Sequence, residues 1–192
     1  MTVKTSTTHV KKLALVIVFS SLGVAMSPFA WFQFLGTKAY PTQHMVNAVL
    51  GVLVGPYWAV IAAVLTGTVR NVLGTGTLFA FPGGIPGGIV VGGIYWILKR
   101  FNIIERKRLV AALSEPIGTV LIGAPIALFL LAPWLGSQTL LDLTAKQGFL
   151  PAFLIFGSGW ALSCVSGSIV GFLILLALST VRIDRETLFG EK

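Results

Sequence analysis

The chain has 192 residues, of which 55% are hydrophobic and only 10% are charged. A soluble domain typically carries about 25% charged residues, so this chain has too few to cover a water-facing surface. The formal net charge is +8, but the positive residues gather at the ends of apolar runs, which is typical of membrane orientation. We therefore expect a lipid bilayer around the chain and no nucleic-acid partner.

The apolar segments are long enough to cross a membrane as helices. Uncharged runs of at least 25 residues occupy 13–37, 39–69, 71–98, 116–141 and 147–181. About 20 apolar residues span a bilayer as a helix, and stretches such as "LILLAL" lack the alternation of β-barrel strands. The first run is too long for a signal peptide and lacks an A-x-A cleavage site. These patterns predict an all-α, polytopic membrane protein with a single integral membrane domain over 1–192.

The run 39–69 contains a break. As one helix its 31 residues would be about 46 Å long, against a hydrocarbon core of about 30 Å. Gly55 and Pro56 lie in its middle, where proline interrupts helical hydrogen bonding. Splitting the run gives six helices, both termini in the cytoplasm, and eleven basic residues inside against three outside. Without the split the better orientation gives nine inside and five outside, so the positive-inside rule favours six helices.

The predicted helices are 13–32, 42–54, 57–73, 83–99, 108–133 and 148–180. The second, at about 20 Å, is too short to cross the bilayer alone, and the third is barely long enough. If both turn at the cytoplasmic side through Gly55 and Pro56, their other ends stop below the outer surface. We expect polar residues at those ends to line a recess that opens to the outside.

Polar side chains gather at those two helix ends. Gln43 and Asn47 share a helix face, with His44 beside them, and the third helix ends in Arg70 and Asn71. A charge at membrane depth usually faces an interior or a water-filled cavity. The alternative is that Arg70 reaches the outer headgroups while the amides satisfy broken helix ends.

Aromatic residues occur at the same level. Most fit an interfacial belt; these are Trp31, Phe32, Phe34, Tyr40 and Trp134. Phe79 and Phe81 lie in the glycine-rich connection that would cover the recess. Flat apolar walls with a few hydrogen-bonding groups suit a small neutral heteroaromatic ligand.

Several other chemistries receive little support. The stretch "GTGTLFAFPGG" has no Walker A lysine and no G-x-G-x-x-G pattern, so we expect no ATP site and no cofactor in this chain. The lone Cys164 provides neither a disulfide nor a cysteine metal set, and we expect no metal. A serine nucleophile at Ser158 with His44 as its base is the enzymatic alternative, and we do not expect an enzyme.

Glu115 is the other charge within an apolar segment. It lies about two turns into the fifth helix from the cytoplasmic end, which predicts a position away from the outer recess. It could cap the helix break at Pro116, pair with the basic cluster 106–108, or act as a proton-coupling carboxylate in a carrier.

Small residues recur every four positions and predict close helix packing. They are Gly84, Gly88 and Gly92 in the fourth helix, and Gly159, Ser163, Gly167 and Gly171 in the sixth. The first helix offers Ser21 and Ala25 at the same spacing, and Ala14 nearer its cytoplasmic end. One of these faces could serve a protein partner.

The middle of the chain resembles a known family. The segment "PTQHMVNAVLGVLVGPYWAVIAAVLTGTVRNVLGTGTLFAFPG" is similar to the ThiW group of substrate-binding S components of energy-coupling factor (ECF) transporters. That group's pattern has a QHMxN stretch, a GP turn, an RNxLGTGT segment and an AFPG segment. The later "SEPIGTVLIGAPIA" resembles its E-x-x-G-T stretch. The resemblance covers about 40–133 well and the rest loosely.

The resemblance implies a role in a prokaryotic cell membrane. S components bind a vitamin or precursor from outside and dock on a transmembrane coupling protein, which two cytoplasmic ATPase subunits drive with ATP. ThiW is assigned to hydroxyethylthiazole, a thiamin precursor; other small vitamins such as thiamin, and a proton-coupled carrier, remain alternatives. The positions that match the motifs are Gln43, His44, Asn47, Arg70, Asn71, Phe79 and Phe81.

The first helix departs from the family pattern. S components tend to carry an AxxxA-like face there for the coupling protein, but Ala14 is followed at that spacing by Val18. The docking face is therefore either weaker at Ala14 or shifted to Ser21 and Ala25.

Overall fold

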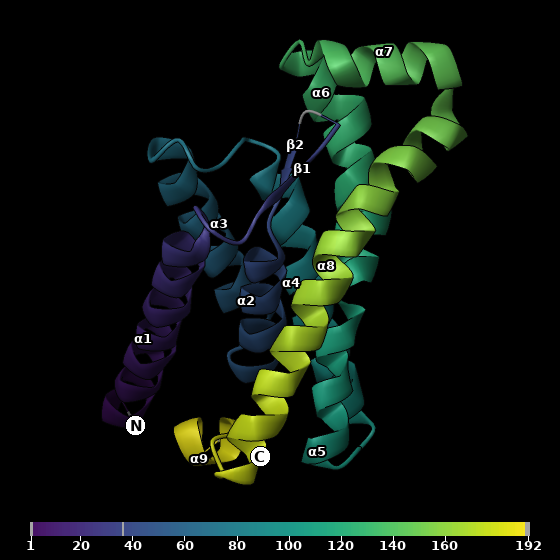
Figure 1. The fold of residues 1–192 in the computed structure, drawn as a ribbon. Helices are drawn as coiled ribbons and strands as arrows, with labels where there is room; N and C mark the ends of the chain where they lie inside the picture. The colour runs from purple at the N-terminus through teal and green to yellow at the C-terminus, as the bar shows by residue number, and fades with distance from the viewer. Residues whose placement is uncertain (1, 36, 191–192) are drawn as a thin grey trace.

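The computed structural model describes residues 2–35 and 37–190. The elements, in chain order, are α1 (Thr2–Met26), β1 (Phe32–Phe34), β2 (Thr37–Ala39), α2 (Pro41–Leu53), α3 (Pro56–Val72), α4 (Ala80–Arg100), α5 (Glu105–Arg108), η1 (Leu109–Ser114), η2 (Ile117–Gly123), η3 (Ile126–Leu131), α6 (Ala132–Trp134), α7 (Gln138–Gln147), α8 (Phe149–Thr180) and α9 (Arg185–Phe189). The column from α5 to α6 stands upright in Figure 1, α8 leans across it, and α7 lies across one end. The predicted all-α membrane architecture is confirmed in this coarse form.

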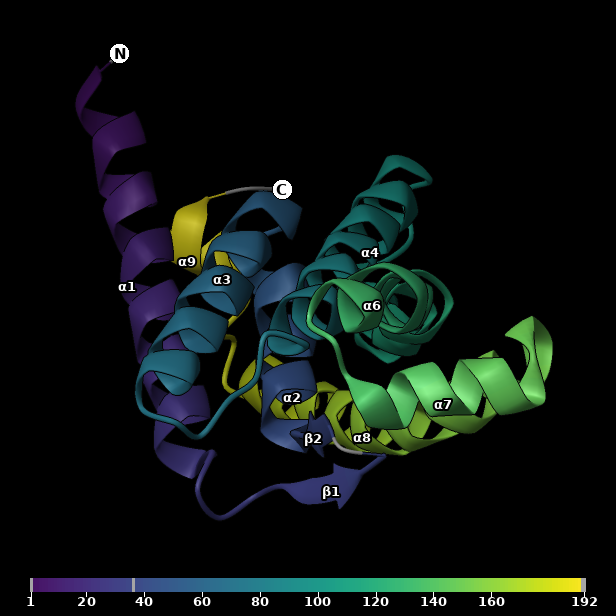
Figure 2. The same ribbon diagram turned by 90° about the horizontal axis from the view of Figure 1, so that it is seen from above.

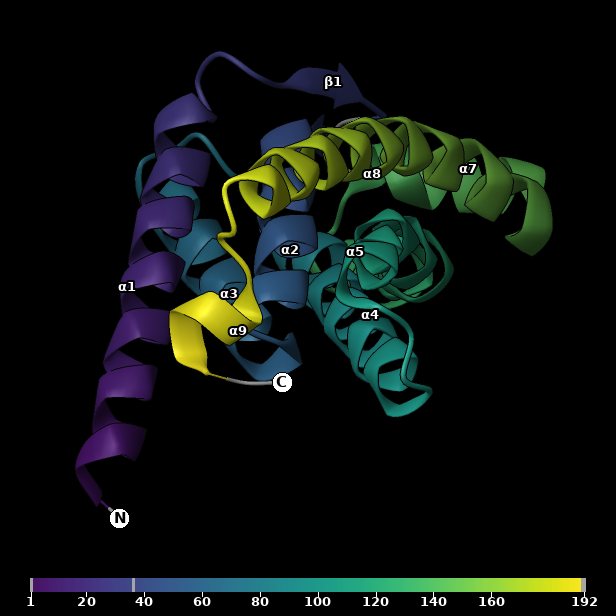
Figure 3. The ribbon, with the colours of Figure 1, turned by 90° about the horizontal axis from the view of Figure 1, so that it is seen from below.

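Within the described residues, four helical segments are long and apolar enough to cross a membrane. They are Thr7–Met26, Ala80–Arg100, Glu105–Trp134 and Phe149–Thr180. The pair α2 and α3 has 13 and 17 residues, so its members are short, as predicted. Gly55 makes the turn between them at φ 91°, a conformation that favours glycine. The start of α1 and the C-terminal α9 lie at the same end of the bundle (Figures 1 and 3). The number of six membrane-spanning helices and the cytoplasmic location of both termini stay predictions.

The segment after the first helix differs from the prediction. The helix ends at Met26 rather than at residue 32, because Pro28 follows and the residue before a proline disfavours helical geometry. A short antiparallel hairpin comes next, pairing Phe32 with Ala39 and Phe34 with Thr37. Strands of three residues carry too little alternation to be recognised in sequence. This hairpin leads directly into α2.

The fifth helix is continuous but irregular. It runs from Glu105 to Trp134, with a 3₁₀ turn at Leu109–Ser114 and π-helical stretches in η2 and η3. Pro116 and Pro125 fall at the junctions, where proline removes a backbone donor and crowds the preceding turn. π-Helical turns of this kind often accompany functional sites.

Helix α2 forms the centre of the bundle. Every residue from Gln43 to Leu53 is buried, and the view from above places α2 among α3, α4 and α8 (Figure 2). Glycines permit this close approach: a Cβ on Gly171 would lie 2.7 Å from that of Ala48, and Gly167 faces the start of α2. On α4, a Cβ on Gly88 would lie 3.0 Å from that of Ala59 in α3. The glycine spacing therefore serves packing within the bundle, as predicted.

Candidate functional site: a buried polar cluster on α2

The first turns of α2 place polar side chains inside the bundle. Because this helix is surrounded on all sides, Gln43, His44 and Asn47 are buried regardless of the face they occupy, with exposed fractions of 3%, 7% and 0%. Gln43 Nε2 donates to Asn47 Oδ1 at 3.4 Å, across one helical turn. A buried polar group is costly without a partner, so these side chains define a constrained site.

Arg70 joins the cluster from the end of α3. Its side chain is 1% exposed, Nη1 donates to Gln43 Oε1 at 3.2 Å, and the guanidinium carbon lies 3.4 Å from the centre of the Tyr40 ring. Stacking of this kind suits arginine. The alternative in which Arg70 reaches outer headgroups is therefore wrong, and Tyr40 belongs to the cluster rather than to an interfacial belt.

Glu115 also belongs to this cluster, so its predicted position away from the recess is wrong. Its side chain is fully buried, and Oε1 lies 2.8 Å from His44 Nδ1, 3.0 Å from Asn47 Nδ2 and 2.8 Å from Thr119 Oγ1. The irregular fifth helix brings this carboxyl group to the depth of the α2 start. It pairs with His44 and not with the basic cluster 106–108.

The cluster connects two buried residues of opposite formal charge. Among the described residues Arg70 and Glu115 form no direct ion pair, but Gln43 and Asn47 lie between them in one hydrogen-bonded chain. Buried charges need compensation by partners of opposite sign or by hydrogen bonds. The formal charges of these two residues cancel within the cluster.

A small cavity borders the cluster. Its volume is about 30 Å³, and its lining includes Tyr40, Gln43, His44, Arg70, Phe79 and Trp160. That space suits a water molecule rather than a ring, whereas sites for small ligands measure about 300–1,000 Å³. Any ligand of ring size therefore requires the covering segments to move.

Some polar atoms around this cavity lack partners within the described residues. Arg70 Nε and Nη2 and Ser163 Oγ are buried without a hydrogen bond there, and so is Glu115 Oε2, although Glu115 does not line the cavity. Such atoms are rare in folded proteins, and each calls for an explanation. Ser163, from α8, lines the cavity together with Arg70, so these atoms can serve a bound molecule.

The remaining predicted residues lie in different places. Phe79 is buried and lines the cavity. Asn71 points elsewhere, because its Nδ2 donates to the carbonyls of Gly67 and Thr77 and so ties the 73–79 connection to α3. Phe81 lies in the first turn of α4 and not in the glycine-rich connection between α3 and α4.

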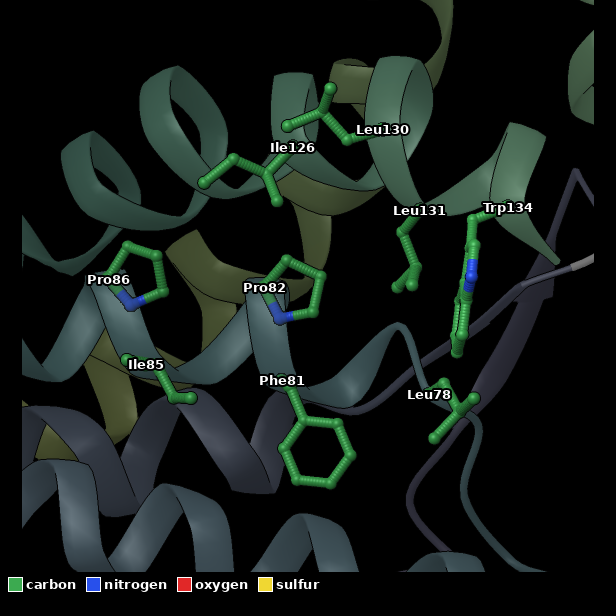
Figure 4. Close-up of a pocket in the computed structure, with 9 residues that line it drawn as sticks. All are labelled: Leu78, Phe81, Pro82, Ile85, Pro86, Ile126, Leu130, Leu131 and Trp134. Carbon is green, nitrogen blue, oxygen red and sulfur yellow. The ribbon is translucent and has the colours of Figure 1, made fainter.

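Phe81 faces a second, apolar groove. This groove, of about 570 Å³, lies between α4 and the η3–α6 part of the fifth helix (Figure 4). Its lining residues are Leu78, Phe81, Pro82, Ile85, Pro86, Ile126, Leu130, Leu131 and Trp134. The prediction that Phe81 covers the polar recess is therefore not reproduced.

Sequence reasoning missed several residues of the cluster. Glu115 and Thr119 are four apart on one helix face, and this spacing was the signal that could have placed them together. Trp160 lies in the middle of a long apolar helix, where no pattern separates it from a packing residue.

Ser158 is exposed and its Oγ donates to the Ile155 carbonyl, so the proposed serine–histidine pair does not form.

The suggested docking residues are accessible. Ser21 and Ala25 are exposed and line a groove of about 370 Å³ between α1 and α3. Ala14 is exposed on the same helix but outside this groove.

The family comparison gives the protein its class. The family model of the thiamine-precursor transporter protein (ThiW) matches residues 13–181. The chain belongs to the ThiW family. ThiW is a transporter family rather than an enzyme family, and the apolar helices of this ThiW chain make it a membrane protein. Neither the curated proteins nor the solved structures compared with the chain include a match.

Proposed function

We propose that this ThiW protein is the substrate-binding S component of an ATP-driven ECF importer in a prokaryotic cell membrane, and that it binds hydroxyethylthiazole. The observation that carries the proposal is the buried cluster at the start of α2, bordered by Phe79 and Trp160. Family membership supports a thiamine precursor as the cargo. The chain would bind the ligand and leave it chemically unchanged.

The charges of the cluster favour a neutral ligand. Arg70 and Glu115 offset each other within the hydrogen-bonded chain, so an uncharged molecule leaves the balance intact. Hydroxyethylthiazole is neutral, whereas thiamin carries a fixed positive charge on its thiazolium ring. Adding an uncompensated buried charge is costly. This argument favours hydroxyethylthiazole over thiamin.

The aromatic residues of the cavity wall suit a flat ring, once the covering segments have moved to make room for it. Phe79 and Trp160 are largely buried and border the same small space. Aromatic side chains pack well against other rings, and a few hydrogen-bonding groups then fix the orientation of the ligand. The walls supply the apolar contact, and the α2 cluster supplies the polar contacts.

Energy for transport would come from partners. The sequence has no Walker A motif, so ATP use is assigned to two cytoplasmic ATPase subunits that act through a transmembrane coupling protein. The groove beside Ser21 and Ala25 is the proposed contact with that coupling protein, with Ala14 as the second possibility. These assemblies follow from the S-component role.

A proton-coupled carrier is the second candidate, because the buried His44–Glu115 contact of 2.8 Å is of the type that carries protons in membrane proteins. Proteoliposomes that contain this chain alone distinguish the two. A carrier accumulates hydroxyethylthiazole when a pH gradient is imposed. An S component binds the ligand but accumulates none without its coupling protein and ATPases.

The main test is a binding titration on the purified chain with no ATPase present. We expect hydroxyethylthiazole to bind in the nanomolar to micromolar range, with thiamin much weaker. Asn47→Ala should weaken binding, because Asn47 holds both Glu115 and the Gly84 carbonyl. Ser158→Ala is the matched control, since Ser158 is exposed on α8. Equal affinity of wild type and Asn47→Ala would place the site elsewhere, and no binding of any thiamin precursor would refute the ligand.

A further inference from the structure

The contacts around His44 indicate which of its two ring nitrogens carries the hydrogen. A neutral imidazole has one nitrogen that donates and one that accepts, and the choice depends on its partners. The hydrogen bond that the structure gives this ring joins Nδ1 to Glu115 Oε1 at 2.8 Å. The role of Oε1 in this bond therefore decides whether the other nitrogen, Nε2, is left as an acceptor.

Asn47 shows that Oε1 accepts. The Gly84 carbonyl can only accept a hydrogen bond, so the Asn47 side-chain atom at 2.9 Å from it must be the amide nitrogen, Nδ2. The same nitrogen lies 3.0 Å from Glu115 Oε1. An amide nitrogen donates, so Oε1 receives this bond.

A second chain of contacts, from the other side, gives the same orientation. Arg70 has donors and no acceptor, so its 3.2 Å contact identifies the Gln43 atom as the oxygen, Oε1. Gln43 Nε2 then donates to Asn47 Oδ1. This leaves Asn47 Nδ2 to face Glu115, in agreement with the Gly84 contact.

We propose that Glu115 holds His44 in the tautomer with hydrogen on Nδ1, so that Nε2 accepts a hydrogen bond from a hydroxyl group of the ligand. In this arrangement Glu115 is a carboxylate with no hydrogen to donate, so Oε1 accepts a hydrogen bond from His44 Nδ1–H beside its contacts with Asn47 and Thr119. Glu115 is thus a positioning residue that acts through His44, which lines the cavity. This inference rests on the proposed function for the identity of the ligand, but the tautomer itself does not.

Arg70 offers hydrogen-bond donors to a ligand, whereas His44 offers an acceptor. Its Nε and Nη2 are buried donors without a partner among the described residues, and Arg70 lines the same cavity as His44. The site therefore offers one acceptor and a separate set of donors. It selects a small alcohol that also carries an acceptor atom, such as a ring nitrogen, and it discriminates against the corresponding ether.

The first experiment reads the tautomer directly. The chain has two histidines, so His9→Gln leaves His44 as the single reporter; His9 is exposed on α1. We expect ¹⁵N NMR of histidine-labelled protein at neutral pH to show a protonated Nδ1 and an unprotonated Nε2. Protonation of Nε2, alone or together with Nδ1, would overturn the proposal. This measurement needs no ligand and no variant of the cluster.

Two substitutions of Glu115 then separate its hydrogen bond from its charge. Glu115→Gln keeps a carbonyl oxygen at the Oε1 position and should retain the Nδ1–H tautomer. Its amide nitrogen takes the place of Oε2, which has no hydrogen-bond partner among the described residues. Glu115→Leu removes the acceptor, and His44 should shift toward the form with hydrogen on Nε2. Loss of the tautomer in both variants would show that the carboxylate charge, rather than acceptance by Oε1, controls His44.

The second experiment measures selectivity with hydroxyethylthiazole and its O-methyl ether. The ether retains the oxygen but lacks the donor hydrogen, so wild type should bind the alcohol about tenfold more tightly, as one hydrogen bond warrants. The ratio should persist in Glu115→Gln and fall toward one in Glu115→Leu. A ratio that is unchanged in Glu115→Leu would refute the specificity role. If neither compound binds wild type, the proposed ligand fails, while NMR still decides the tautomer.

Discussion

The guanidinium of Arg70 lies over the ring of Tyr40, with its central carbon 3.4 Å from the ring centre. The two residues belong to different parts of the chain, because Tyr40 directly precedes α2 and Arg70 lies in the last turn of α3. Their contact holds the open ends of this short helix pair together. It also leaves Nε and Nη2 of the arginine without a hydrogen-bond partner in the part of the chain that the structure describes.

Replacing this arginine with lysine should weaken the fold and the site together. Arg70→Lys keeps the charge but loses the planar group that stacks on Tyr40 and contacts Gln43, at a cost of roughly 1–3 kcal/mol. Thermal unfolding of purified protein should show a lower Tm, and hydroxyethylthiazole should bind less tightly. Arg106→Lys, on an exposed arginine of α5, is the control and should change neither. A wild-type Tm in Arg70→Lys would contradict the structural role of the stack.

A methyl group at Gly87 should displace the carboxyl group of the cluster. A Cβ at this position would overlap Glu115 Oε1, and overpacking of a core typically costs about 1–3 kcal/mol. We expect Gly87→Ala to lower Tm and to disturb the His44 ring signals. Gly93→Ala on the same helix is a matched control, because a Cβ there meets none of the described residues within 4 Å. If both alanine variants behave alike, close contact at Gly87 is not what holds Glu115.

Loosening the 73–79 connection should change ligand exchange more than stability. Asn71 Nδ2 bonds the carbonyls of Gly67 and Thr77, at 2.7 and 3.1 Å, and so ties this segment to α3. Asn71→Ala removes both bonds, and stopped-flow measurements should show release of hydroxyethylthiazole several-fold faster, as the loss of about 1 kcal/mol implies. Gln147→Ala, at the exposed end of α7, should leave the rates unchanged. An unaltered release rate in Asn71→Ala would exclude this connection as the cover.

A bulky residue in the α1–α3 groove should block coupling but not binding. Ser21 lines this groove and Ala14 does not, so we expect Ser21→Trp to abolish uptake in cells that contain the coupling protein and ATPases. Ala14→Trp should have a small effect, and both variants should bind hydroxyethylthiazole normally when purified. The reverse pattern of uptake would locate docking at Ala14 instead.

The local geometry of the site could largely be predicted from the sequence. Gly55 and Pro56 predicted two short helices, and helical spacing then brought Gln43 and Asn47 to one face and Arg70 to the same depth. These inferences succeeded because they depend on neighbours along the chain. The predicted position of Glu115 was wrong because its depth depends on how the fifth helix packs against α2. Counting helical turns from the cytoplasmic end of the fifth helix does not show that packing.

Two other features lay beyond sequence patterns for similar reasons. Phe79 and Phe81 are the same residue type two positions apart, so the sequence does not distinguish them. However, α4 begins at Ala80, and its first turn places Phe81 in a separate groove. The hairpin of β1 and β2 depends on pairing between residues 32–34 and 37–39. Each outcome follows from tertiary packing rather than from local preference.

The enclosure of α2 also governs the order in which the site can be assembled. Gln43, His44 and Asn47 are synthesised early, but α8, the last long helix, lies against α2 at Gly167 and Gly171. Until it arrives, polar side chains at the start of α2 remain open to lipid or water, which is unfavourable within a membrane. A nascent chain that stops before α8 therefore holds an incomplete site, and the C-terminal helix acts as the final step of its maturation.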